Sequence, residues 1–184
     1  MKFWASRIRE RLSATITCKM NTMELDCALR SDPYTKKHYG GTFALDRLPE
    51  HLSPNQLFIL NLSPSGHEGS HWTQISTIDG LTYFDSFGRP PPLEIVPKLL
   101  TAGQTVYWSD QVIQSLISQV CGYHVLMVSF LQARGYNLRE ILTNFYHSDD
   151  EDYLRNDAYA LRVISSLTTL KERPLIDWSN FLEK

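Results

Sequence analysis

The sequence predicts an α+β fold in which a small central mixed sheet packs against helices. A pair of short strands, rich in Thr, Ile, Tyr and Phe, surrounds the turn that ends in Gly80. Downstream, residues 121–131 form an apolar run that predicts a helix, and two further helical patterns follow. With 184 residues, 42% of them hydrophobic, the chain is long enough to bury one proper core.

The segments on either side of this hairpin are interpreted as scaffold. Residues 23–30 predict a helix, and residues 56–62 predict an apolar strand. After the hairpin, three prolines at 90–92 interrupt regular structure. A short helix over residues 94–100 and a strand over residues 106–108 are expected next.

Register in the predicted hairpin decides whether His71 and Asp85 can meet. A two-residue turn would set Asp85 opposite Gln74 and point His71 to the other face of the sheet. A type I turn followed by a left-handed Gly80 gives a three-residue loop, which sets Asp85 opposite Thr73. Asp85 then lies diagonal to His71 on the same face, within side-chain reach. The sequence favours this second register.

Cys121 stands at the predicted start of the apolar helix. The first backbone amides of a helix have no acceptor within it and carry partial positive charge. They stabilise a thiolate and can donate to a developing oxyanion. Cys121 is therefore a candidate nucleophile, and His71 is its candidate base.

Two helices are expected beyond residue 131. Residues 137–146 carry apolar side chains at helical spacing. Ser148 then opens a predicted capping box with Glu151 before a long helix. The acidic run at 149–152 falls in the first turn of that helix, where the helix dipole favours negative charge, so no metal site is expected there.

Four motifs follow one another along the chain. They are His71-Trp72, the strand ending in Phe84-Asp85-Ser86-Phe87-Gly88, Gln114, and Cys121-Gly122. Their order resembles the adenovirus-type cysteine proteases, the adenain family, with relatives in adenovirus-like viruses and Polinton-type mobile elements. Residues 31–49 also resemble the segment before the catalytic histidine of that family, so the similarity covers about residues 23–145. More distantly, the same order resembles the SUMO- and ubiquitin-like-protein-specific proteases.

The resemblance implies a papain-like cysteine protease fold of the adenain type, with the nucleophile at a helix N-terminus. Cys121 would be the nucleophile, and His71 the general base that later protonates the leaving amine. Asp85 would orient the imidazole, and Gln114 would donate its side-chain amide to the oxyanion. Members of this family cleave viral precursors after Gly-Gly or Gly-x sites during particle maturation, so protein and peptide substrates with such sites are implied.

The chain departs from the family pattern in ways that bear on its cofactors. The acidic residue is often glutamate in the family, and here it is Asp85. Residues 116–118 are Leu-Ile-Ser where the family often has Pro-Asn-Ser, so we expect this loop to be stiffened by packing. The adenovirus enzyme is activated by a peptide tethered through a cysteine, but no cysteine lies between Cys27 and Cys121. No cofactor is expected to be required, and a noncovalent peptide activator stays open.

Three other functions compete with this prediction. A deubiquitinase or SUMO-protease activity is the nearest alternative, because ubiquitin-like tails also end in Gly-Gly. An acyltransferase would need a basic phosphate-binding cluster beside the triad, and none is evident. A noncatalytic binding module would not need the four site residues intact.

One pattern suggests a zinc protease instead. His67, Glu68 and His71 match the H-E-x-x-H motif, and Glu94 would be a distant third ligand. The motif works on a continuous helix, whereas Gly69 interrupts this segment and a strand follows it. A metal site is therefore not expected.

Charge and cysteine content limit the partners and the compartment. The net charge of −2 gives no general case for nucleic acid, so the use of DNA as a cofactor is not carried over. No apolar run is long enough to span a bilayer. Three cysteines, an odd number, predict free thiols in a reducing intracellular compartment. The resemblance implies the host nucleus or cytoplasm, with packaging into virions.

The chain is predicted to consist of two parts. Residues 1–22, where basic side chains are interleaved with apolar ones, are interpreted as an N-terminal extension outside the resemblance. Residues 23–184 are expected to form a single cysteine protease domain.

Overall fold

A computed structural model describes residues 19–100 and 105–169 of the chain. Its helices and strands are α2 (Thr22–Ser31), β1 (Tyr39–Ala44), β2 (Leu57–Asn61), β3 (Trp72–Ser76), β4 (Leu81–Phe84), α3 (Val96–Leu100), β5 (Val106–Trp108), α4 (Cys121–Gln132), α5 (Leu138–Leu142) and α6 (Asp150–Thr169). Two 3-10 turns, η1 (Thr35–Lys37) and η2 (Leu45–Arg47), flank β1. The predicted α+β class is confirmed.

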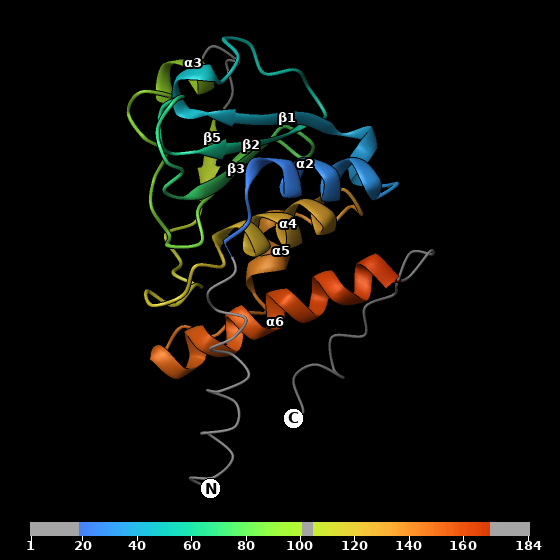
Figure 1. Ribbon diagram of the computed structural model, residues 1–184, viewed down its shortest axis with the longest axis vertical. Helices are drawn as coiled ribbons and strands as arrows, with labels where there is room; N and C mark the ends of the chain where they lie inside the picture. Colours follow the sequence, from blue (N-terminus) through green and yellow to red (C-terminus); the bar gives the residue numbers. More distant parts are fainter. Residues whose placement is uncertain (1–18, 101–104, 170–184) are drawn as a thin grey trace, which may run out of the picture.

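The five strands form one mixed sheet in the order β1-β2-β3-β4-β5 (Figure 1). The outer pairs, β1 with β2 and β4 with β5, are parallel, while β2, β3 and β4 are antiparallel. The sheet is therefore small, central and mixed, as predicted. Strands β1 and β5 are its edges.

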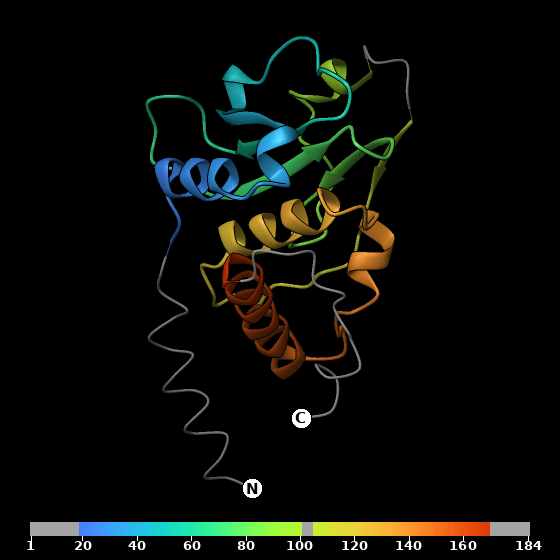
Figure 2. The same cartoon turned by 90° about the vertical axis from the view of Figure 1, so that its right-hand side faces the viewer.

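Helix α4 lies between the sheet and α6, and Figures 1 and 2 show these layers from two directions. Most side chains on every side of α4 are apolar, and all its residues except Cys121 and Tyr123 are buried. A helix that is largely apolar on all sides is typically buried inside a core. Its burial fixes the helix, so Cys121 at its first position has a rigid support.

Apolar residues fill both faces of the sheet. One core joins the sheet to the helices, and its members include Trp72, Phe84, Val125 and Phe130. The other core lies on the opposite face, under α3, and it includes Ile75 and Tyr83. The hairpin β3–β4 is thus covered on both sides, which favours a single register.

The hairpin has the predicted register. Gln74 pairs with Phe84, and Ser76 pairs with Thr82. This pairing corresponds to a three-residue loop, in which Gly80 adopts a left-handed conformation with φ of 75°. If this pairing continues by one residue along each strand, Asp85 lies opposite Thr73. The two-residue alternative is excluded.

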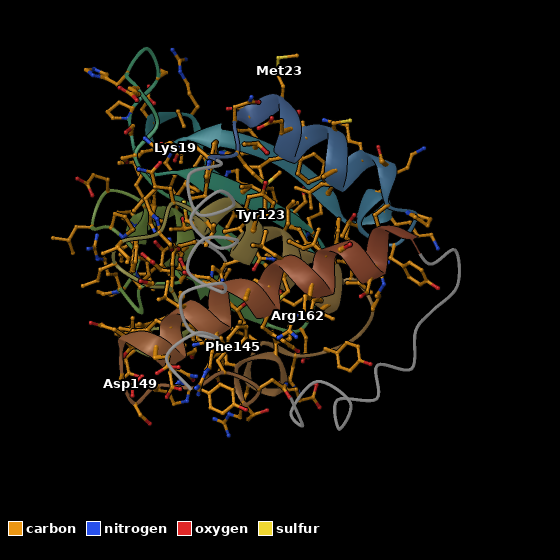
Figure 3. The ribbon with its side chains drawn as sticks, turned by 60° about the horizontal axis from the view of Figure 1, so that its bottom comes forward. Lys19, Met23, Tyr123, Phe145, Asp149 and Arg162 are labelled. Carbon is orange, nitrogen blue, oxygen red and sulfur yellow. The ribbon has the colours of Figure 1, made fainter. Side chains whose placement is uncertain are left out.

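Some predicted elements differ from the structure. The capping box of Ser148 with Glu151 is wrong, because Asp149 caps α6 by accepting from the amide of Asp152 at 2.9 Å. Figure 3 shows Asp149 at the start of this helix. The helix predicted over 137–146 ends at Leu142.

A strand at β1 was not predicted, because two adjacent glycines interrupt its pattern. The second, Gly41, has φ of 135°, and the pairing with β2 shifts beside it. The parallel partner β2 holds this strand in place despite its weak propensity for a strand.

In the described ranges no helix is both long and apolar enough to cross a membrane.

Candidate active site

His71 and Asp85 meet where β3 begins and β4 ends. His71 Nε2 donates to Asp85 Oδ1 at 2.8 Å, and both side chains are buried. The same oxygen accepts the backbone amide of Phe87 at 2.8 Å. Two donors therefore hold the carboxylate, which in turn fixes the imidazole. Since Nε2 is used by Asp85, Nδ1 is the ring nitrogen left for a nucleophile.

Cys121, the first residue of α4, lies beside the imidazole. Its sulfur interacts with the His71 side chain and accepts from the backbone amides of Trp72 and Gly122. Burial raises the pKa of the thiol, but these bonds and the His71 charge lower it further than burial raises it. The helix start thus stabilises a thiolate, as its sequence position predicts.

The pKa of the His71 imidazole is raised, which complements the lowered pKa of the Cys121 thiol. Burial lowers the pKa of His71, but its bonds to Asp85 and Cys121 prevail and raise the pKa to about 9. A protonated His71 beside a deprotonated Cys121 is an ion pair ready for nucleophilic attack. The structure therefore brings the predicted nucleophile, base and acidic residue together.

Phe87 supports the base, and sequence reasoning gave it no role. Its ring stacks on the His71 ring, with centroids 4.9 Å apart and planes at 28°. The guanidinium carbon of Arg89 lies 5.3 Å from the centroid of the Phe87 ring. Phe87 belonged to the motif ending at Gly88, so the signal was present in the sequence, but its contact with the imidazole was not evident there.

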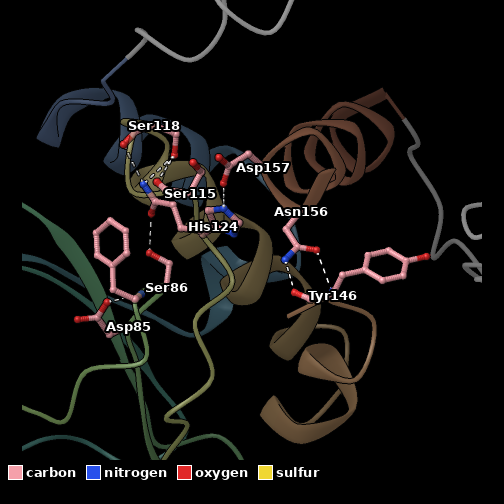
Figure 4. A network of polar contacts seen from close by, with 10 residues as sticks. Asp85, Ser86, Ser115, Ser118, His124, Tyr146, Asn156 and Asp157 are labelled. Atoms are coloured by element: carbon pink, nitrogen blue, oxygen red, sulfur yellow. Dashed lines mark hydrogen bonds and ion pairs between the residues drawn. The ribbon is translucent and has the colours of Figure 1, made fainter. Parts of the chain in front are cut away.

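Gln114 lines the same cavity as Cys121 and His71. Its side chain is buried, and Oε1 accepts from the Ser86 hydroxyl at 2.7 Å. Nε2 donates to the carbonyl and the hydroxyl of Ser118, at 3.3 and 3.2 Å. Figure 4 shows these contacts around the labelled Ser86 and Ser118. Three of the predicted site residues, His71, Gln114 and Cys121, thus line one cavity, and Asp85 bonds to His71 behind it.

The cavity has a volume of about 610 Å³ and the form of a groove between two chain segments. One wall is the loop at 63–70, which leads into His71. The other wall is formed by residues 19–22, where the Trp72 indole donates to the Met20 carbonyl at 2.8 Å. These four residues fall in the predicted extension, whereas residues 1–18 lie outside the described part of the chain. The division at residue 22 stays a prediction.

Substitution of Gly122 by alanine is expected to disturb this wall. An added Cβ would lie 2.8 Å from Met20 Cβ. Because the Met20 Cβ is attached directly to the main chain, rotation of the Met20 side chain alone could not relieve this clash. Such overpacking costs about 1–3 kcal/mol. We expect a lower melting temperature and a higher KM for peptide substrates. Unchanged stability and KM in Gly122→Ala would contradict the tight contact.

The loop before the nucleophile corrects one expectation. Leu116 and Ile117 are 77% and 75% exposed, so packing does not stiffen this loop. Hydrogen bonds do so instead, because the amide and the hydroxyl of Ser118 both donate to the Ser115 carbonyl, at 3.1 and 3.0 Å. These bonds close a turn whose two apolar residues point away from the core.

The zinc motif lacks the helix that it requires. Residues 67–71 form an irregular segment, and His71 is held by Asp85. Within residues 19–100 and 105–169, no group of three or more His, Cys, Asp or Glu side chains is arranged for a metal ion. The segment instead serves as one wall of the groove.

The paired charges predict a bell-shaped pH dependence of kcat/KM. The pKa of His71 rises from 6.5 to about 9, so the imidazolium, and activity with it, is lost as pH rises through about 9. Its contribution to stability is full below about pH 6.5 and is lost over the same rise. The thiolate is lost only below the lowered pKa of Cys121.

The measurements are cleavage rates and rates of alkylation by iodoacetamide, each as a function of pH. Alkylation follows the thiolate alone, so we expect it to show only the acidic step, while cleavage shows both. An alkylation step at the ordinary thiol pKa would contradict the ion pair.

Comparisons with known proteins add no relative. No protein-family model matches the chain. A search of curated proteins likewise finds no sequence of significant similarity. The likeness to the adenain family therefore remains a resemblance in the order of the motifs.

Proposed function

We propose that the chain is a cysteine endopeptidase that cleaves viral or mobile-element precursor proteins after Gly-Gly or Gly-x sites during particle maturation. The observation that carries this proposal is the contact of Cys121 with His71, itself bonded to Asp85 at 2.8 Å, in one groove with Gln114. The resemblance in motif order supports the glycine preference and a papain-like fold of the adenain type.

In the proposed reaction, the Cys121 thiolate attacks the scissile carbonyl carbon. The carbonyl oxygen becomes an oxyanion, which the Gln114 side-chain amide and a backbone amide at the start of α4 stabilise. Protonated His71 gives its proton to the leaving amine as the C–N bond breaks, which leaves a thioester on Cys121. Neutral His71 then takes a proton from water as the water oxygen attacks the thioester carbonyl. The C–S bond breaks, the acid is released, and the Cys121 thiolate is regenerated beside protonated His71.

A noncovalent peptide activator would find a place at β5. This edge strand exposes Tyr107 and Trp108, which are 64% and 44% exposed. An extended peptide can add to such an edge through main-chain hydrogen bonds. The strand also lies shortly before Gln114, where the resemblance puts the activator. The proposed compartment is a reducing one, in which Cys121 stays a free thiol.

The experiment compares three substrates of the purified chain. A fluorogenic Leu-x-Gly-Gly peptide is expected to be cleaved, and a matched Leu-x-Ala-Ala peptide is not. A folded ubiquitin-like protein with a C-terminal fluorogenic amide is expected to be no better than the short peptide. A large preference for the folded protein would favour the isopeptidase alternative, and cleavage of neither would contradict the proposal.

A further inference from the structure

Ser86 stands between the acidic residue and Phe87, and it is fully buried. Its carbonyl accepts the backbone amides of Ile113 and Gln114, at 2.9 and 3.1 Å. Its hydroxyl donates to Gln114 Oε1 at 2.7 Å. One serine therefore holds Gln114 through both main chain and side chain, across 28 residues of sequence.

The orientation of the Gln114 amide is fixed from both ends (Figure 4). The Ser118 carbonyl can only accept a hydrogen bond, so it requires the amide nitrogen on its side. The Ser86 hydroxyl satisfies the amide oxygen on the other side. A reversed amide would set two acceptors, Oε1 and the Ser118 carbonyl, against each other.

The two ends are held unequally. The bond to Oε1 is 2.7 Å, whereas those from Nε2 are 3.2 and 3.3 Å. A length of 2.7 Å is ordinary for an O–H···O bond, whereas 3.2 and 3.3 Å exceed the usual length of about 2.9–3.0 Å for an N–H···O bond. The bonds from Nε2 are therefore the weaker ones, so an N–H of Gln114 can turn to an oxyanion while Oε1 remains held. A donor that is fixed in direction but loosely engaged suits an oxyanion hole, since it needs little reorganisation during the reaction.

We infer that Ser86 is a positioning residue for the oxyanion donor, whose hydroxyl keeps the Gln114 amide nitrogen on the cavity side. This inference rests on the proposed function, because an oxyanion forms only if Cys121 attacks a carbonyl. It also gives the tripeptide Asp85-Ser86-Phe87 a joint role. Its first and third residues hold the base, and its middle residue holds the oxyanion donor.

A double-mutant cycle tests the inference, using Ser86→Ala, Gln114→Ala and the double variant. The main-chain bonds of Ser86 survive the substitution, so the fold is expected to persist. Loss of an oxyanion donor costs about 10²–10³ in kcat, and we expect Ser86→Ala to lose about 10- to 100-fold. In the Gln114→Ala background it should lose nothing further, because its target is gone. An equal loss in both backgrounds would overturn the inference.

A matched control separates positioning from general stability. Ser129 is also buried, and its hydroxyl accepts from the Gln74 side chain at 3.1 Å, away from the groove. Ser129→Ala makes the same chemical change, so we expect an effect on melting temperature but unchanged kcat. Alkylation of Cys121 should keep its pH profile in Ser86→Ala. A shifted profile would mean that Ser86 acts on the base instead.

A measurement without turnover keeps the inference decidable if no peptide is cleaved. The side-chain amide protons of Gln114, assigned by their loss in Gln114→Ala, are observed by NMR. We expect two separate, sharp resonances in the wild type, and shifted or broadened ones in Ser86→Ala. Unchanged resonances would overturn the inference. Absent cleavage with altered resonances would instead contradict only the proposed function.

Discussion

Replacing Cys121 with alanine is expected to reduce peptide cleavage to the uncatalysed background. The thiolate is the group in the groove that the proposed reaction uses as a nucleophile, and it interacts directly with the His71 side chain. Loss of the nucleophile from a Ser-His-Asp protease costs on the order of 10⁶ in kcat. The measurement is cleavage of a fluorogenic Leu-x-Gly-Gly peptide by the two proteins at equal concentration.

Cys27→Ala is the matched control. Cys27 is a free, exposed thiol on α2, outside the residues that line the groove. Its removal should leave kcat and KM unchanged. Iodoacetamide should inactivate the wild type and Cys27→Ala alike, and a zinc chelator should affect neither. Activity that survives Cys121→Ala but falls with the chelator would restore the metal hypothesis and reject the cysteine mechanism.

The hairpin was predictable in detail because its determinants are local. A left-handed glycine and the loop length fix the turn, and strand alternation then sets which side chains share a face. This was enough to bring Asp85 diagonal to His71. The start of α4 was predictable for a similar reason, since an apolar run with Cys121 at its head needs no knowledge of distant residues.

The walls of the site were not predictable, because they depend on contacts between distant segments. Met20 reaches the groove through a bond from Trp72, 52 residues away. Ser86 is part of a recognised motif, but its bond to Gln114 appears only when the two loops are side by side. The exposure of Leu116 was also missed, because an apolar sequence by itself favours burial. Its turn is closed by hydrogen bonds that composition does not reveal.

Replacing Asp85 with asparagine is expected to reduce kcat/KM by about 10³–10⁴, the scale seen when the acidic member of a triad loses its charge. An amide can accept from His71 Nε2, but it supplies no negative charge to support an imidazolium. The pKa of His71 should therefore fall from about 9. The alkaline limit of cleavage should move to lower pH, and the alkylation step of Cys121 should move to higher pH.

The chain offers a close control in a second buried pair, seen in Figure 4. His124 Nε2 lies 2.8 Å from Asp157 Oδ1, and both side chains are almost fully buried between α4 and α6. Neither residue lines the groove. Asp157→Asn should therefore lower the melting temperature while leaving both pH profiles in place.

The comparison separates two uses of the same bond. If the bond of Asp85 to His71 only held the hairpin together, Asp85→Asn and Asp157→Asn would both destabilise the protein and neither would move a pH profile. If the bond sets the charge of the base, only Asp85→Asn shifts the profiles. The reason is that His71, the partner of Asp85, contacts a thiol, whereas His124, the partner of Asp157, lies outside the groove. The contrast thus tests whether the carboxylate acts on the reaction through His71 or merely on the fold.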